Sequence, residues 1–446
     1  MKKINLYRTL GLTVLFIVFS LSQGFAQSDS RSINSSGSFY SLYGVGFPVE
    51  NNTARELSMG ISGVSLDNTL FNTFSNPAQS YTLSNPALWG KNFYATTSSG
   101  FKLSQYNATD NTSESLNSDI SAGYLQVTLP IFRQKFGISA SLYPVTSSNY
   151  RNFNSGTIVT SENESIDYVS DISGSGGVNK FEIGFGWNIN KNFAVGYAPS
   201  LAFISQENTT ELFFNQNEYP YNYVDSKVNG SSFSHRFGAL LTFENILSDN
   251  DRISFGSSYI LPVEISTEET TETSRLISNR QQNVTLGETI SGNAKLPAEL
   301  NTGLTYYPSN FVNLSMEGKF QQWSNARSDL NTNTSSLELT DRVKLGLGGE
   351  YHPYRTNSTN FLSNFRYSGG ISYDTGHLKA QNQEINTLWF SAGLGIISRF
   401  NNSSIDLSVQ HGLRGTTSND LIKEKIWSFN LSVNLTELMF FRPKLN

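Results

Sequence analysis

The chain has 446 residues, of which 15% are charged and 13% aromatic, and it contains 35 glycines and no cysteine. The lack of cysteine excludes disulfides and thiolate metal sites, and the formal net charge of −5 argues against nucleic acid as a partner. Few charges with many aromatic residues are unusual for a soluble surface. One large all-β unit is therefore a better expectation than two or three soluble domains.

The first 26 residues have the pattern of a secretory signal peptide. Lys2, Lys3 and Arg8 precede the apolar run "LGLTVLFIVFSL", and small residues follow with a cleavage position near Ala26. The run is too short for a comfortable membrane-spanning helix. Cleavage would remove three of the 31 basic residues and none of the 36 acidic ones, which leaves a mature chain with a net charge of about −8.

Residues 27–91 show no spanning alternation and are predicted to form an N-terminal plug that fills the lumen of a barrel. Proline fixes its own φ and biases the preceding residue toward extended or turn geometry, and an Asn side chain can bond nearby backbone. Two such turns would let a short segment fold back compactly, although ordinary loop turns are the alternative. The tripeptides concerned are Asn76, Pro77, Ala78 and Asn85, Pro86, Ala87.

From residue 92 onward the dominant pattern is period-two alternation. "KFEIGFGWNIN", for example, places Phe181, Ile183 and Phe185 on one face and Lys180 and Glu182 on the other. The pattern predicts fourteen strands with approximate bounds of 92–105, 119–131, 135–147, 176–190, 192–205, 231–245, 251–265, 295–307, 311–323, 338–353, 362–375, 385–399, 404–413 and 424–437.

The composition of the two faces favours a membrane barrel. The apolar face is rich in aromatic residues, and the other face carries mostly Gly, Ser and Asn, which suits strands with one face toward lipid and the other toward a lumen. A secreted β-sandwich or solenoid is the alternative. No stretch approaches 18 consecutive apolar residues, so a helical membrane protein is excluded. We expect an all-β, transmembrane antiparallel β-barrel of about 14 strands over residues 92–446 that ends in a short periplasmic tail.

The connections are predicted to alternate between short turns and long polar loops. "RQK", "NK" and "PSN" are tight, whereas 148–175, 206–230 and 266–294 are long, as in outer-membrane barrels with periplasmic turns and extracellular loops. Both chain ends would then be periplasmic. One long connection, "TTELFFNQNEYPYNYV", is a candidate ligand-capture site because an apolar patch in an exposed loop marks an interaction surface; an aromatic girdle or loop packing is the alternative. Its residues are Leu212, Phe213, Phe214, Tyr219, Tyr221 and Tyr223.

The third predicted strand contains a proline within its alternation. Pro144 cannot donate to a strand ladder, so we expect a bulge or inward bend there, where two strands could separate. Pro144, with Tyr143 and Val145, is therefore a candidate for a lateral exit. The alternative is that Pro144 merely ends the strand near the outer rim.

No catalytic, metal or cofactor site is predicted, and we expect no enzymatic activity. The four histidines, His235, His352, His377 and His411, lie far apart and lack metal-ligand spacing. Ser234 adjoins His235 without a recognisable partner motif. "GSGG" at 174–177 lacks the helix and lysine of a phosphate loop and is interpreted as a flexible strand entry.

The segment "FYSLYGVGFPVENNTARELSMGISGVSLDNTLFNTFSNPAQSYTL" resembles the plug of the FadL-type long-chain fatty-acid transporter family, in its Bacteroidetes-like form. Met59-Gly60 and Asn76-Pro77-Ala78 occupy the places of the family's Met-Gly and Asn-Pro-Ala motifs. Later segments such as "KLPAELNTGLTYYPSNFVNLSMEGKFQQWS" are similar to its barrel strands. The ending "LMFFRPKLN" departs from the terminal aromatic residue of many outer-membrane proteins. The resemblance implies a Gram-negative outer-membrane barrel that takes up hydrophobic molecules through its plug and releases them sideways into lipid.

Three functions follow from these observations. The first is transport of hydrophobic small molecules, fatty-acid-like or aromatic, by a monomer embedded in outer-membrane lipid. The second is a general porin, which would need an open, charged constriction. The third is a FadL-like scaffold in protein secretion or surface attachment.

Overall fold

The computed structural model describes residues 37–67, 82–159, 165–215, 221–277, 280–328, 337–353, 361–398 and 403–437. The expected signal peptide, the first Asn-Pro-Ala copy and the chain end after residue 437 lie outside these ranges. Within them, no helix is both long enough and apolar enough to cross a membrane.

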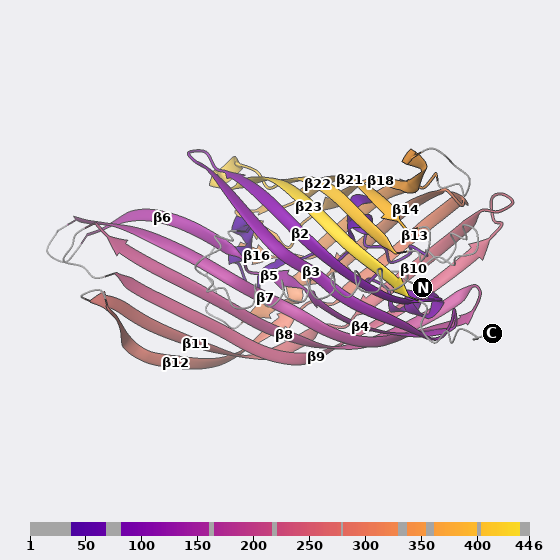
Figure 1. Ribbon diagram of the computed structural model, residues 1–446. Helices are drawn as coiled ribbons and strands as arrows, with labels where there is room; N and C mark the ends of the chain where they lie inside the picture. Colours follow the sequence, from indigo (N-terminus) through magenta and orange to yellow (C-terminus); the bar gives the residue numbers. More distant parts are fainter. Residues whose placement is uncertain are drawn as a thin grey trace, which may run out of the picture. The chain divides into compact units, whose positions relative to one another are not determined.

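The described chain is built mainly of strands (Figure 1). The helical elements are short: α2 (Ala54–Ser58) and the 3-10 turns η1 (Phe39–Leu42), η3 (Pro86–Lys91), η4 (Trp323–Asn325), η5 (Phe361–Asn364) and η6 (Ser418–Asp420). The strands are β1 (Phe47–Pro48), β2 (Ala95–Thr109), β3 (Glu114–Phe132), β4 (Phe136–Pro144), β5 (Thr146–Ser147), β6 (Tyr150–Val159), β7 (Ser165–Asn190), β8 (Phe193–Phe214), β9 (Asn222–Glu244), β10 (Arg252–Ile260), β11 (Val263–Ile277), β12 (Arg280–Leu296), β13 (Glu299–Ser309), β14 (Val312–Gln321), β15 (Arg327–Ser328), β16 (Leu337–Leu339), β17 (Arg342–Tyr351), β18 (Phe365–Asp374), β19 (Leu378–Ala380), β20 (Gln383–Glu384), β21 (Thr387–Ile397), β22 (Ser404–Arg414) and β23 (Lys423–Glu437).

The strands close into an antiparallel barrel of fourteen passes, as the alternation predicted. The last pass meets the first, because β23 pairs with β2 from Glu437 opposite Ala95 to Lys423 opposite Thr109. β10 and β11 both pair with β9 and form a single pass that is interrupted near Pro262. Closure of the barrel removes most of the open edges that an extended sheet would expose.

The distribution of residues across the barrel wall is inverted relative to a soluble protein. Along β22, Asp406 and Ser408 are each 2% exposed, whereas Leu407 between them is 51% exposed. The same alternation continues in β23, where Ser428 is buried and Phe429 exposed. An apolar outer face with a polar inner face is the pattern of a barrel that faces lipid.

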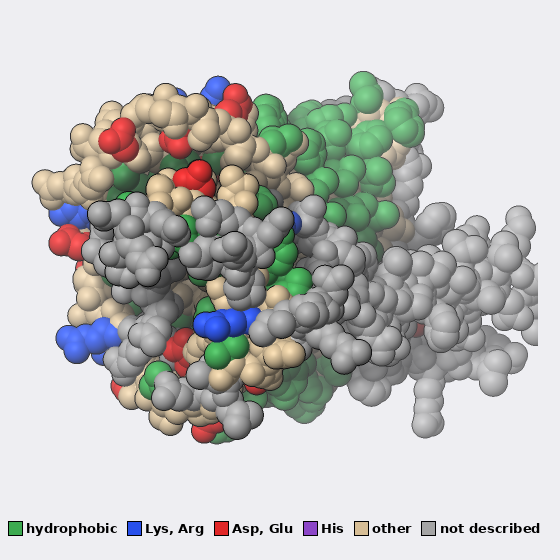
Figure 2. Space-filling model, turned by 90° about the vertical axis from the view of Figure 1, so that its left-hand side faces the viewer, with side chains coloured by type: hydrophobic (Ala, Val, Ile, Leu, Met, Phe, Trp, Pro, Cys, Tyr) green, Lys and Arg blue, Asp and Glu red, His purple; other side chains and the backbone are tan. Residues whose placement is uncertain are grey.

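The long connections predicted from the sequence are largely strands, which corrects the expected loops at 148–175, 206–230 and 266–294. β6 and β7, β8 and β9, and β11 and β12 form extended hairpins that project beyond the neighbouring strands (Figure 1). Their sequences are largely polar and lack a continuous apolar face, so alternation of hydrophobicity does not reveal them. Seen from this end, polar and charged side chains occupy much of the near rim, and hydrophobic side chains gather on the wall behind it (Figure 2).

Residues 37–67 and 82–94, which we call the inner segments, pack against the inward faces of the strands. Helix α2 begins at a capping box, in which Thr53 accepts from the backbone of Glu56 and Glu56 accepts from that of Thr53. It packs against β18 and β21–β23, and η3 packs against β4 and β7–β9. Met59 and Trp89 are fully buried there. Two short helical elements thus occupy different sides of the interior.

Candidate functional site

The barrel wall separates locally between β3 and β6. β3 pairs with β4 from Leu125 opposite Leu142 to Phe132 opposite Phe136. Residues 114–124 still pair with β2, but within the described chain they form no ladder with β5 or β6. β6 in turn pairs with β7. Two neighbouring passes therefore diverge toward the end that carries the long hairpins, and we call this divergence the wall break.

The wall break begins where the third pass bends inward. β4 ends at Pro144, which has no N–H for a ladder, and β5 then pairs with β1 of the inner segments. The backbone N–H of Val145 donates to the carbonyl of Val178 at 2.7 Å, so contact with β7 persists. Gly176 and Gly177 in β7 have φ values of 92° and 136°, which favour glycine. Two glycines with positive φ in the neighbouring strand thus accompany the bend.

A cavity of about 260 Å³, which we call the gap cavity, lies behind the wall break. Ser121 and Ala122 of β3 line one side and Pro144 lines the other. The side-chain amide of Asn149 donates to the carboxylate of Asp119 at 2.9 Å, which bridges the two diverging passes. A side-chain contact, in place of a backbone ladder, therefore bridges the two passes at this point.

The gap cavity is amphipathic. Arg342 binds Asp374 at 2.5 Å and Glu50 at 2.8 Å, so several of its charges neutralise one another. Apolar side chains lie among these charges. The charged lining residues are Glu50, Lys102, Asp119, Arg342, Lys344, Asp374 and Arg414, and the larger apolar ones are Phe47, Val49, Leu57 and Trp389.

An apolar cluster lines the interior beside the wall break. Val178 and Ile265, from β7 and β11, are fully buried and pack with Val45 of the inner segments. Val145, the residue after the bend, packs against the same cluster. The inward face is therefore not uniformly polar, and its apolar part adjoins the place where the wall separates.

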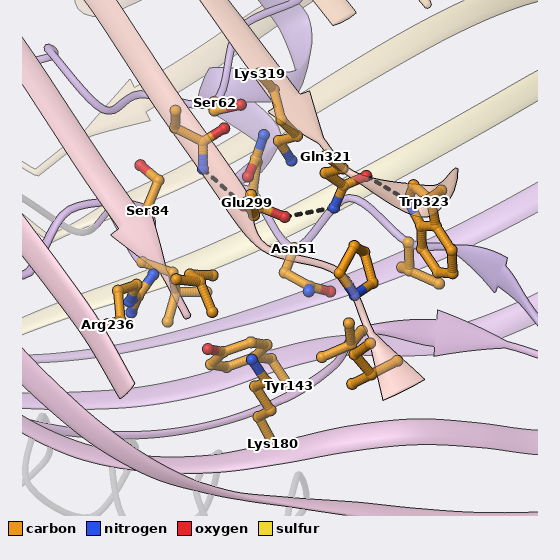
Figure 3. Close-up of a pocket in the computed structure, with 18 residues that line it drawn as sticks. Asn51, Ser62, Ser84, Tyr143, Lys180, Arg236, Glu299, Lys319, Gln321 and Trp323 are labelled. Atoms are coloured by element: carbon orange, nitrogen blue, oxygen red, sulfur yellow. Dashed lines mark hydrogen bonds between the residues drawn. The ribbon is translucent and has the colours of Figure 1, made fainter. Parts of the chain in front are cut away.

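A second, smaller cavity of about 80 Å³ lies between the inner segments and β4, β7, β9, β13 and β14; we call it the inner cavity (Figure 3). Lys180, 4% exposed, donates to Ser234 at 3.0 Å. Glu299 accepts from Asn301 at 2.7 Å. Figure 3 places Lys180 and Glu299 on opposite sides of the cavity, with Asn51 and Tyr143 between them.

Buried polar contacts fasten the inner segments to the wall. Arg55 of α2 binds Glu350 of β17 at 2.6 Å. Lys91 donates to Thr242 of β9 at 3.0 Å and also binds Asp67 of the other inner segment at 2.5 Å. Glu317 accepts from the backbone N–H groups of residues 62, 63 and 65 at 2.8–3.1 Å. Breaking a buried ion pair from one side is costly, because it leaves an uncompensated charge. The inner segments are therefore held by groups that resist displacement.

The second Asn-Pro-Ala copy lies in the inner segments, whereas Asn76, Pro77 and Ala78 lie outside the described residues. Asn85 caps η3 by accepting from the N–H of Ala87 at 3.0 Å, and Pro86 occupies the first turn. The Asn85 amide also donates to the carbonyls of Val64 and Ala239. This tripeptide thus joins two inner segments to β9 rather than forming an isolated turn.

The predicted capture residues lie at the far ends of β8 and β9, except Tyr219, which is outside the described residues. Phe213 and Tyr221 meet edge to face with centroids 5.1 Å apart. Leu212, Phe214 and Tyr223 lie in the same hairpin. The structure does not bring these residues to the wall break, where Tyr143, Pro144 and Val145 lie.

The three predicted exit residues face different surroundings. Tyr143 points inward and donates to Glu182 at 3.2 Å. Pro144 lines the gap cavity, and Val145 lines the inner cavity. The bend therefore separates the two cavities. The sequence analysis did not identify the polar residues that line the two cavities, such as Asp119 and Lys180. Their only signal in the sequence is a charge at an inward position of an alternating strand.

The histidines are dispersed, as expected from the sequence. The Nδ1 of His235 lies 2.9 Å from the hydroxyl of Tyr197, and the ring of His377 is tilted against that of Trp323 with centroids 4.7 Å apart. Among the described residues, no three His, Asp or Glu side chains are grouped to hold a metal ion.

The closed fourteen-strand barrel, with chain segments packed inside it, has the fold of FadL-type channels. Similar solved structures are a FadL homologue of Pseudomonas aeruginosa (13% identity, TM-score 0.56, covering 87% of this chain and 99% of that chain) and the toluene transporters TodX of Pseudomonas putida (15%, 0.52, 88% and 99%) and TbuX of Ralstonia pickettii (13%, 0.54, 87% and 98%).

The family model described as BamG matches residues 7–446, and the chain belongs to the BamG family. No curated protein sequence matches the chain significantly. The solved structures share too little sequence to transfer a ligand, so they establish the fold alone. The Bacteroidetes-like origin stays a prediction.

Proposed function

We propose that this protein lies in the outer membrane and lets hydrophobic or amphipathic small molecules, fatty-acid-like or aromatic, pass between its lumen and the lipid at the wall break. The observation that carries the proposal is the gap cavity behind two diverging passes, at the bend that follows Pro144. Unpaired backbone is tolerated at membrane depth only where it lines a cavity or is covered by protein. An apolar solute that left there would enter lipid without crossing the periplasm.

The surroundings of the break support this route. The apolar cluster that contains Val45 and Val178 adjoins the bend on the inner side. On the outer side, Leu116 and Ile120 of β3 are 66% and 67% exposed, beside the edge that lacks a ladder. A molecule with an apolar body and a polar end would find both kinds of group along this path.

We further propose that residues 27–91 act as a plug that blocks free ion flow. A fourteen-strand lumen is too wide for wall side chains to fill, and the inner segments supply buried side chains and ion pairs there. Deleting residues 38–91 should raise planar-bilayer conductance sharply. Large stable channels formed by the intact protein would favour a porin instead.

A disulfide across the wall break tests the route directly, because the chain has no cysteine of its own. Asp119→Cys with Asn149→Cys joins two side chains that already touch. The oxidised variant should take up labelled fatty acid or toluene more slowly, and reduction should restore the rate. Ser104→Cys with Ser428→Cys, across an intact ladder, is the matched control.

A proline substitution tests the bend in a second way. Pro144→Val should favour continuous pairing and slow uptake, whereas Pro130→Val, at the opposite end of the β3–β4 ladder, should not. Barrel abundance is checked by heat-modifiable gel migration. Unchanged uptake in both the disulfide and the Pro144 variants, at equal abundance, would remove the wall break from the mechanism.

A scaffold role in protein secretion or surface attachment is the second candidate. It is favoured by the small, charged cavities and by the ion pairs that hold the inner segments. A scaffold would bind a partner protein while showing no saturable uptake of fatty acids or aromatic hydrocarbons. Binding assays with both classes of ligand therefore separate the two functions.

A further inference from the structure

The inner cavity contains two opposite charges, Lys180 and Glu299, that form no ion pair within the described residues. Buried lysines elsewhere meet carboxylates, as Lys91 does at Asp67 and Lys344 at Glu50. The hydrogen bond described for Lys180 goes to a neutral hydroxyl instead. Glu299, which lines the opposite side, accepts only from the neutral amides of Asn301 and Gln321 among the described contacts. The nearby Lys319 forms its ion pair with Glu50. A buried charge without a counter-ion in contact is unfavourable.

Hydrogen-bonding groups that lack a partner line the same cavity. The Nε–H of Arg236 has no acceptor, and its residue is 5% exposed. The side-chain oxygens of Asn51 and Asn301 have no donor. A terminal nitrogen of the same Arg236 guanidinium already binds Glu182. Cationic and donor groups thus complement an anion, whereas Glu299 and the two amide oxygens complement a cation.

The cavity size limits the ligand. A water-sized probe needs roughly 10–15 Å³, so a cavity of about 80 Å³ has room for a compound with about five to eight non-hydrogen atoms. A simple anion would leave Glu299 without an ion pair, and a simple cation would leave Lys180 without one. A compact molecule that carries both charges matches the site.

We propose that the inner cavity binds a small zwitterion, an α-amino acid of about the size of glycine or alanine. Its carboxylate would lie toward Lys180 and the Nε–H of Arg236, and its ammonium toward Glu299 and Asn301. Asn51, from the inner segments, would bond the ligand from a third side. The ligand would thereby connect the inner segments to the wall, and this inference does not depend on passage at the wall break.

The test uses the purified full-length protein in detergent. Equilibrium dialysis with labelled glycine and alanine should show saturable binding at a stoichiometry near one, and the same ligands should raise the thermal unfolding midpoint. Acetate and methylammonium, which each carry one of the two charges, should do neither, and tryptophan should be excluded by size. No saturable binding of glycine or alanine, or equal effects of acetate, would overturn the proposal.

Variants locate the site. Lys180→Met and Glu299→Gln should each weaken binding at least tenfold, whereas Lys102→Met, which changes a lysine of the gap cavity, should leave it unchanged. Gel migration shows whether each variant forms a barrel. Should Lys180→Met not fold, Glu299→Gln and a cavity-filling Ser84→Leu variant provide the same comparison. Binding unaffected by all folded variants would place the ligand elsewhere.

Discussion

Gly177 faces the backbone of Thr146 so closely that a methyl group on its α-carbon would stand 2.3 Å from the Thr146 carbonyl oxygen. Gly177 also has φ of 136°, a conformation that L side chains rarely adopt. The contact lies where β5 leaves the wall to pair with β1. A glycine in β7 therefore makes room for the bend in the third pass.

We expect Gly177→Ala to disturb the bend. The substitution costs about 1–3 kcal/mol from backbone strain and displaces Thr146. Cysteines introduced at Phe47 and Ser147, which are opposite each other in the β1–β5 ladder, should cross-link readily in the parent protein. With Gly177→Ala added, the rate of cross-linking should fall severalfold.

The matched control is Gly369→Ala. This glycine also lies in a strand, but the nearest atom to an added methyl group would be 3.7 Å away. Cross-linking that is equally fast with both alanine substitutions would show that the bend does not depend on Gly177.

The Lys91 to Asp67 ion pair gives a prediction about stability. Both side chains are nearly inaccessible, so Lys91→Met leaves a buried carboxylate without its cation and should lower the free energy of unfolding by about 3–5 kcal/mol. Urea unfolding in detergent measures the loss. Adding Asp67→Asn should recover much of it, because the stranded charge is then removed. A double variant that is less stable than Lys91→Met alone would contradict this account.

The sequence was sufficient to predict the number of strands because lipid imposes alternation on each pass. β22 illustrates this, with Leu407 outward and Asp406 inward. Alternation of apolar and polar residues is less informative where strands extend beyond the apolar wall, which is why the sequence predicts loops where the structure has long hairpins. The inner face of the barrel is predicted to be rich in Gly and Ser. In the structure it also carries more charged side chains than the composition indicates.

The candidate site was less predictable than the barrel. Pro144 had a local signal, because proline cannot join a ladder, and Asn85 had the signal of an N-cap. The contact between Asp119 and Asn149 had no signal of its own, since it joins two passes whose divergence is a property of the closed wall. Likewise, the separation of Lys180 from Glu299 depends on how β7 and β13 curve around the inner segments.

The exposed outer face predicts where the membrane lies. Leu407→Arg should lower barrel stability by roughly 2–4 kcal/mol, because arginine near the bilayer midplane is costly. Val159→Arg should have little effect, since this residue, 66% exposed, lies at the end of β6 in an extended hairpin. Unfolding in lipid vesicles measures both. Equal losses at the two positions would place the hairpins within the hydrocarbon region.

The aromatic pair at the end of the β8–β9 hairpin gives the last prediction. Phe213 and Tyr221 pack edge to face with centroids 5.1 Å apart, a geometry that leaves part of each ring accessible. If the two rings bind a ligand before the ligand reaches the gap cavity, they affect the apparent affinity for the ligand. They do not affect the rate of its later passage. An aromatic contact is worth about 0.5–1.5 kcal/mol, equivalent to roughly a two- to tenfold change in apparent affinity.

Phe213→Ala with Tyr221→Ala should therefore raise the half-saturating concentration for uptake of fatty acid or aromatic hydrocarbon by that factor and leave the maximal rate unchanged. The disulfide across the wall break should do the reverse, because it restricts the step after capture. Val159→Ala, at the end of β6, is the control for a hydrophobic loss in a projecting hairpin. A reduced maximal rate without a shift in half-saturation would show that the aromatic pair serves the structure of the hairpin rather than capture.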